Sequence, residues 1–193
     1  MFKRLILATS AVLLTSLSIS PDGLSSRRDN PCNYLDLKFE EPSKTLRTVQ
    51  LPTLGITVDI PSNYRMVLFQ DGRIEILSPA EFKFFQCIAK HGTEGLVGGG
   101  RFSQSFRALT QSETIRLLET HRNDGSGIWQ YSTSNFDGFI ITSSSGYGAS
   151  FVGTLPNRSR LGRMSHIEVS IYCDCPVEVS DLLDLLSRIK PMP

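Results

Sequence analysis

Hydrophobic and polar residues alternate over several short segments of the chain, which is the pattern of half-buried β-strands. The alternation is regular from Leu54 to Ile60 and ends at Pro61. Further strands are expected at 64–70, 73–77, 128–132, 139–143 and 149–155, and around Ile167. Many short strands joined by short turns predict a mainly antiparallel sheet.

A hairpin is expected around the Asp-Gly dipeptide at 71–72, because a two-residue type I′ turn needs positive φ at both central positions. A loop of two residues would pair Phe69 with Ile74 and Val67 with Ile76. Both faces of this hairpin then carry apolar residues. We therefore expect layers of structure to cover it on both sides.

Two capping boxes mark the beginnings of helices. Ser78 and Glu81 predict a helix over 79–90, although the aromatic-rich segment 83–89 is also compatible with a strand. Thr110 and Glu113 predict a second helix that extends to about residue 122. We expect this second helix to bury the stripe that contains Ile115 and Leu118.

The end of the chain predicts a third helix over 181–189. Ser180 is its expected N-cap and Pro191 its expected stop. Leu182, Leu183, Leu185, Leu186 and Ile189 form a broad apolar face. At least one of Leu185 and Leu186 should therefore be buried against the sheet.

The composition agrees with an ordinary globular protein: 40% of the 193 residues are hydrophobic and 20% are charged. We predict one α+β domain over 53–193, a mainly antiparallel sheet covered by helices and similar to an α/β/α sandwich. Residues 19–52 contain four prolines and little periodicity. We expect them to form an irregular lead-in.

Residues 1–18 have the pattern of a signal peptide. Lys3 and Arg4 precede an apolar, uncharged stretch at 5–19, which is shorter than the roughly 20 residues of a membrane-spanning helix. Cleavage after Ser18 would leave no transmembrane span, while an uncleaved anchor and a buried helix stay open as alternatives. The expected location is the periplasm, the thylakoid lumen or the extracellular space.

Four cysteines in an exported chain favour two disulfides over free thiols. Cys173 and Cys175 follow the alternating strand around Ile167 and should share its buried face. Same-face neighbours on a strand lie roughly 6.6 Å apart with parallel side chains, which disfavours a bond between these two. Each should pair with Cys32 or Cys87, and the spacing does not decide which.

The charge of the chain argues against nucleic-acid binding. Lys and Arg exceed Asp and Glu by one, whereas phosphate binding needs a concentrated basic surface. Arg158, Arg160 and Arg163 concentrate positive charge on what reads as a hairpin tip. This tip is a candidate docking site for an acidic partner or for membrane headgroups, and a solvated loop is the simpler interpretation. The partner class we expect is an envelope or membrane-associated protein.

No catalytic set is evident, because the three histidines lie apart and no Gly-x-Ser-x-Gly motif occurs. We therefore predict a non-catalytic binding or assembly module that needs no cofactor. Two alternatives remain. One is a small hydrolase assembled from distant residues, which would show a polar cleft lined by a histidine. The other is a zinc site of the Cys₃His type, formed by Cys87, His91, Cys173 and Cys175.

Three segments carry a resemblance to known proteins: Pro-Ser-Asn-Tyr-Arg at 61–65, Asp-Gly-Arg-Ile-Glu-Ile-Leu-Ser-Pro at 71–79 and Phe-Gln-Cys at 85–87. They resemble the opening of small exported cyanobacterial proteins of uncharacterised function. The order of the expected elements is also similar to the α/β/α sandwich of the PsbP-like extrinsic photosystem proteins. This second resemblance implies an architecture and no residue roles, since a fold does not determine a function.

Overall fold

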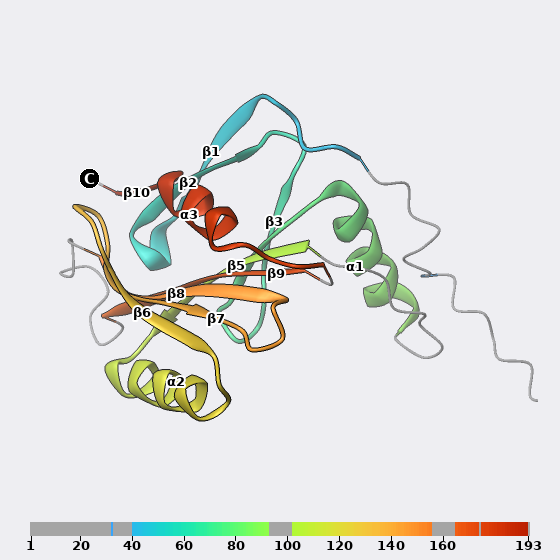
Figure 1. Ribbon diagram of the computed structural model, residues 1–193. Helices are drawn as coiled ribbons and strands as arrows, with labels where there is room; N and C mark the ends of the chain where they lie inside the picture. The colour runs from blue at the N-terminus through green and yellow to red at the C-terminus, as the bar shows by residue number, and fades with distance from the viewer. Residues whose placement is uncertain (1–31, 33–39, 93–101, 156–164, 174, 193) are drawn as a thin grey trace, which may run out of the picture.

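In the described part of the chain, two antiparallel β-sheets and three helices form an α+β domain (Figure 1). The computed structural model describes residue 32 and residues 40–92, 102–155, 165–173 and 175–192. The expected signal peptide at 1–18 lies outside these residues.

Among the described residues, the larger sheet has seven strands in the order β3-β4-β5-β9-β8-β7-β6. Along β9, Ile167, Val169 and Ile171 are buried and alternate with polar residues, as the sequence predicts. β9 pairs with β5 on one side and β8 on the other. The strands are β3 (Arg65–Leu68), β4 (Ile74–Leu77), β5 (Phe102–Leu109), β6 (Gly127–Ser132), β7 (Asp137–Thr142), β8 (Gly148–Thr154) and β9 (His166–Cys173).

A second, three-stranded sheet consists of β1 (Leu46–Leu51), β2 (Ile56–Pro61) and β10 (Ile189–Pro191), with a 3-10 turn, η2 (Pro52–Leu54), between β1 and β2. Its buried residues join those of the larger sheet in the main core. β1 corrects the expected irregular lead-in over 19–52. Pro52 begins η2 directly after β1, so it ends the strand and does not prevent it.

The helices are α1 (Pro79–His91), α2 (Gln111–Asn123) and α3 (Val179–Ser187). Both predicted capping boxes are present, and the strand considered at 83–89 is wrong because these residues belong to α1. α3 and the small sheet lie on one side of the larger sheet, and α2 lies on the other (Figure 1). α1 contacts β4 at one end of the larger sheet.

Two details of the helices differ from the expectation. Ile115 is 49% exposed, and α2 instead uses Leu117 and Leu118 to pack against a small apolar cluster. The buried face of α2 is therefore rotated from the predicted one.

α3 begins at Val179, with Glu178 as its N-cap residue, and Ile189 belongs to β10.

The predicted hairpin forms with a different register. Leu68 pairs with Ile74, because the loop between the two strands has three residues, 70–72. The N–H of Phe69 donates to the carbonyl oxygen of Arg73 at 2.8 Å and closes this loop. Gly72 adopts φ +80°, which agrees with a type I turn followed by a left-handed residue. The one-residue shift moves β3 side chains to the opposite face. Leu68 is 66% exposed on this edge strand, so the expected covering on both sides is wrong there.

Both disulfides form, but the predicted pairing is wrong. Cys32 bonds Cys87, and Cys173 bonds Cys175. The Cα atoms of the second pair are 4.9 Å apart, because β9 ends at Cys173 and Cys175 no longer has the spacing of a regular strand. In this state the alternative zinc set has no thiolates to offer, since three of its four members are disulfide sulfurs.

Replacing Leu185 or Leu186 with alanine should lower the free energy of unfolding by about 2–5 kcal/mol, because both side chains are buried at 1% exposure. Leu183 lies on the same helix, is 36% exposed and provides the matched control. Its replacement should cost less than about 1 kcal/mol. Chemical denaturation measures all three, and equal losses would show that α3 does not dock through this face.

Candidate functional site

The face of the larger sheet opposite α3 carries polar side chains on its central strands. Glu168 and Ser170 alternate with the buried residues of β9 and therefore point to this face. Arg107 of β5 pairs with Glu168, and Ser150 of β8 pairs with Ser170. We call these four residues the polar ladder.

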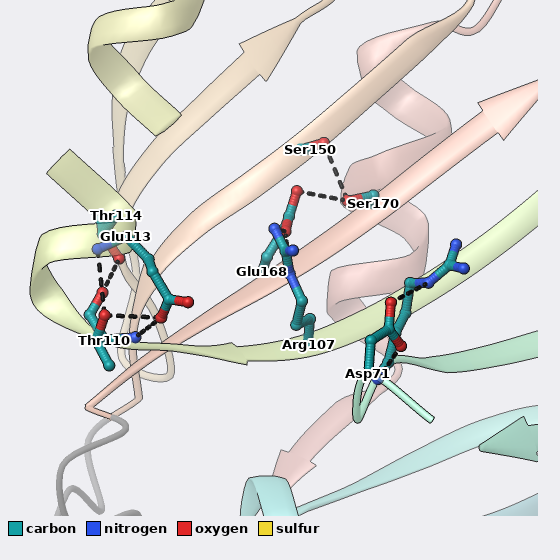
Figure 2. Close-up of polar contacts among 9 residues, drawn as sticks. Asp71, Arg107, Thr110, Glu113, Thr114, Ser150, Glu168 and Ser170 are labelled. Carbon is teal, nitrogen blue, oxygen red and sulfur yellow. Dashed lines mark hydrogen bonds and ion pairs between the residues drawn. The ribbon is translucent and has the colours of Figure 1, made fainter. Parts of the chain in front are cut away.

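Figure 2 shows the contacts of the polar ladder. Arg107 donates to Glu168 Oε2 from Nε at 3.0 Å and from Nη2 at 2.6 Å. Ser170 Oγ donates to Glu168 Oε1 at 3.3 Å, and Ser150 Oγ donates to Ser170 Oγ at 3.1 Å. The ladder thus joins β5, β9 and β8 through side chains that are hydrogen-bonded to one another. We therefore treat it as a supporting surface and not as a binding site.

The beginning of α2 lies beside the polar ladder in Figure 2 and is held by a dense set of hydrogen bonds. Glu113 Oε2 accepts from the Thr110 main-chain N–H and from its hydroxyl, both at 2.7 Å. These bonds favour the charged carboxylate and lower the pKa of Glu113. Thr114 Oγ1 donates to the Thr110 carbonyl oxygen at 3.0 Å. This bond fixes the position of the Thr114 side chain.

A hollow of about 300 Å³ lies between α2 and strands β6 to β9; we call it the α2 hollow. Its polar groups come from different elements, and Phe139 contributes apolar surface. The hollow is lined by Thr114, Gln130, Asp137, Gly138, Phe139, Val152, Gly153, Thr154 and His166. It is the candidate functional site because it combines donors, acceptors and apolar surface in a concave space.

Of the three histidines, His166 lines the α2 hollow. Its Nδ1 lies 2.8 Å from Ser165 Oγ. His121 lies in the last turn of α2, where Nδ1 is 3.2 Å from Asp124 Oδ2, and His91 is the exposed last residue of α1. The structure therefore brings one of the predicted candidates to a concave site and leaves two at helix ends.

Two glycines set the backbone beneath the α2 hollow. Gly138 of β7 pairs with Gly153 of β8. A Cβ atom at Gly138 would lie 2.3 Å from the Val152 carbonyl oxygen, and one at Gly153 would lie 2.4 Å from the Asp137 carbonyl oxygen. Any larger residue would therefore force the two strands apart.

No sequence pattern marks the other polar residues of the hollow. Asp137 precedes the strand expected at 139–143, and Thr114, Gln130 and Thr154 carry no motif. The relevant signal was the alternation itself, because the pairing of Val152 with Glu168 places Thr154 and His166 on the same face of β8 and β9. That pairing is not visible in a single segment.

Several predicted features fall outside the described residues. The arginine tip with Arg158, Arg160 and Arg163 lies within 156–164, and the expected signal peptide at 1–18 lies within 1–31. Among the residues the structure describes, no group of three or more His, Cys, Asp or Glu side chains is arranged to hold a metal ion. Within the same described segments, no helix has the length and apolar composition required to span a bilayer.

Gly153→Ala should lower stability by about 1–3 kcal/mol or more, because its Cβ would overlap the backbone of β7. Gly148→Ala provides the matched control on β8: its Cβ would have its nearest contact at 3.4 Å, an ordinary distance. Thermal unfolding of both variants measures the difference. Similar melting temperatures would show that β7 and β8 can separate without cost.

Glu113→Gln should reduce stability at neutral pH, and the gap to the wild type should close in acid. A carboxyl group with a lowered pKa stabilises the fold above its unfolded value, here 4.5, and loses this contribution as the pH falls through the folded value. Urea unfolding across this pH range measures the gap. In a Thr110→Ala background, which removes the hydroxyl donor, the same change should have a smaller effect; an equal effect would contradict the assignment.

The resemblances noted in the sequence stay predictions after comparison with known proteins. No protein-family model, curated protein or solved structure matches this chain. The function is therefore argued from the geometry of the candidate site.

Proposed function

We propose that the protein is an exported, disulfide-tied, non-catalytic binding module, and that the α2 hollow binds a small polar molecule. The observation that carries the proposal is the meeting of Asp137, Thr154 and His166 around one concave space of about 300 Å³. This volume is at the lower end of known ligand sites, which run from roughly 300 to 1,000 Å³.

The groups of the hollow define the chemistry of the ligand. Asp137 supplies acceptors, Gln130 supplies both an acceptor and donors, and His166 supplies a ring nitrogen. Phe139 adds apolar surface. A small molecule with amine or hydroxyl groups and a compact hydrocarbon part fits this set.

The supporting structure favours binding by a preformed site. The polar ladder fixes β5, β9 and β8 relative to one another, and Thr114 is held by its bond to Thr110. Side chains that are already ordered lose little entropy when a ligand arrives. The hollow therefore needs few contacts to reach useful affinity.

Export is supported by the cysteines. All four lie among the described residues and all are in disulfides, as is usual in oxidising compartments. We keep an envelope or membrane-associated protein as the partner class, with the arginine tip as its docking site. The small-molecule site and this protein partner are compatible, because they use different parts of the chain.

A small hydrolase is the second candidate, and one contact favours it. Ser165 Oγ lies 2.8 Å from His166 Nδ1, which places a hydroxyl beside a histidine that lines the hollow. A triad also needs a carboxylate that orients the histidine. Asp137 lines the same hollow, but the contact it makes with Thr154 uses its main-chain oxygen, so binding remains the better-supported function.

Titration of ¹⁵N-labelled mature protein with amino acids, monosaccharides and short amines tests the proposal. A ligand of the hollow should shift the amide signals of Gly138, Gly153, Thr154 and His166. Asp137→Asn should weaken its binding by about tenfold, the value of one charge-assisted hydrogen bond. Ser143→Ala, in the turn at the other end of β7, should not change it. Shifts that map elsewhere, or no binding at millimolar concentrations, would reject the site.

Hydrolysis of p-nitrophenyl acetate separates the two candidates. A binding module should show no turnover above the buffer rate. Turnover that disappears in Ser165→Ala, while the folded signal is retained, would replace the binding proposal with the hydrolase.

A further inference from the structure

The two disulfides of the chain differ in their surroundings. Cys32–Cys87 joins residues 55 apart in the sequence, and Cys32 is buried. Cys173–Cys175 joins residues two apart; Cys173 is buried, and Cys175 is exposed. We propose that the Cys173–Cys175 disulfide is a site of thiol–disulfide exchange with exposed thiols of other polypeptides, an activity independent of the α2 hollow.

Accessibility assigns different roles to the two sulfurs. A thiolate must approach a disulfide sulfur directly, so the exposed Cys175 is the point of attack. Cys173, the last residue of β9, is buried and is then the leaving group. In the reverse direction, Cys173 is the resolving thiol that closes the bond again.

The fold can tolerate the opening of this disulfide. A bond across two residues restricts the unfolded chain far less than a bond across 55, so its loss changes stability little. Hydrogen bonds also hold the segment on both sides of the bond. The N–H of Cys173 donates to the Tyr147 carbonyl oxygen and the N–H of Val177 to the Gly146 carbonyl oxygen, both at 3.0 Å. The two thiols therefore stay close together after reduction and can re-form the bond.

Exposed aromatic side chains point to a polypeptide as the source of the thiol. Tyr172 precedes Cys173 and is 47% exposed, and Tyr147 accepts the hydrogen bond from Cys173 through its carbonyl oxygen and is 44% exposed. Exposed tyrosines are enriched where proteins bind other proteins. A small thiol such as glutathione would gain nothing from them, whereas a peptide that bears a dithiol would pack against them.

The exchange is balanced for electrons and protons. A thiolate of the peptide attacks Cys175 Sγ, the bond to Cys173 breaks, and Cys173 leaves as a thiolate that takes up a proton. The second thiol of the peptide then attacks the peptide sulfur of the mixed disulfide and releases Cys175. The Cys173–Cys175 pair gains two electrons, and the peptide dithiol is oxidised to a disulfide. A low-molecular-weight disulfide such as glutathione disulfide can restore the starting state.

The first test compares the two disulfides in the oxidised mature protein. The protein is equilibrated with glutathione buffers of increasing reducing strength, alkylated and analysed by mass spectrometry. Cys173 and Cys175 should be labelled at an about tenfold lower thiol-to-disulfide ratio than Cys32 and Cys87, with circular dichroism unchanged at that point. Simultaneous opening, or earlier opening of Cys32–Cys87, would overturn the proposal. A double Cys173→Ser, Cys175→Ser variant is the matched control and should lose the early labelling.

Single variants test the roles of the two sulfurs. Cys173→Ser leaves Cys175 as a thiol, and Cys175→Ser leaves Cys173. The exposed Cys175 thiol should react with dithionitrobenzoate about tenfold faster than the buried Cys173 thiol. Equal rates would contradict the assignment of Cys175 as the attacked sulfur.

A reduced dithiol peptide tests the expected client. The wild-type protein should oxidise it faster than an equal concentration of glutathione disulfide does. Replacing Tyr147 and Tyr172 with serine should slow this reaction and leave exchange with glutathione unchanged. Oxidation of the peptide no faster than by glutathione disulfide, or an equal effect of the tyrosines on both reactions, would overturn the polypeptide client.

Discussion

The alternation of side chains along β9 is the constraint on which the rest of the structure depends. Ile167, Val169 and Ile171 must be removed from water, and they are covered by α3 and joined to the core that contains the small sheet. The same alternation turns His166 and Glu168 to the opposite face. The polar ladder and the α2 hollow thus exist because the apolar half of β9 is buried.

The two parts of the polar face differ in how their groups are satisfied. In the ladder, the Arg107–Glu168 ion pair and the two serines use one another as partners. The α2 hollow lies where β7, β8 and β9 meet α2, and its polar groups, among them Asp137, Thr154 and His166, line a concave space. Side chains that bond one another form a supporting surface, and side chains gathered around a concave space form the candidate site.

Local signals in the sequence were sufficient for much of the fold. The capping boxes at Ser78 and Thr110 predicted the beginnings of α1 and α2, and strict alternation predicted β2 and β9. β5 was missed, although it is central, because the polar residue Gln104 occupies an inward position and breaks the apolar pattern. Its neighbours in space come from distant parts of the chain, which a single sequence does not reveal.

The hairpin register and the cysteine pairing were predicted wrongly, because both predictions assumed regular geometry at the end of a strand. The hairpin has a three-residue loop in place of a two-residue one, and this choice alone shifts the register of β3. The cysteine pairing failed for the same reason, since Cys175 lies beyond the end of β9. The candidate site was not predicted because its residues come from α2 and several strands and share no motif.

The place of β10 in the small sheet has a consequence for folding kinetics. β1 and β2 are close in sequence and can pair early, but β10 pairs with β2 across most of the domain, as in the contact of Lys190 with Asp59 over 131 residues. Contacts of such high sequence separation slow folding, because loop closure must precede their stabilising effect. The small sheet should therefore be completed late, and an early folding intermediate would contain the larger sheet with the far edge of β2 still open.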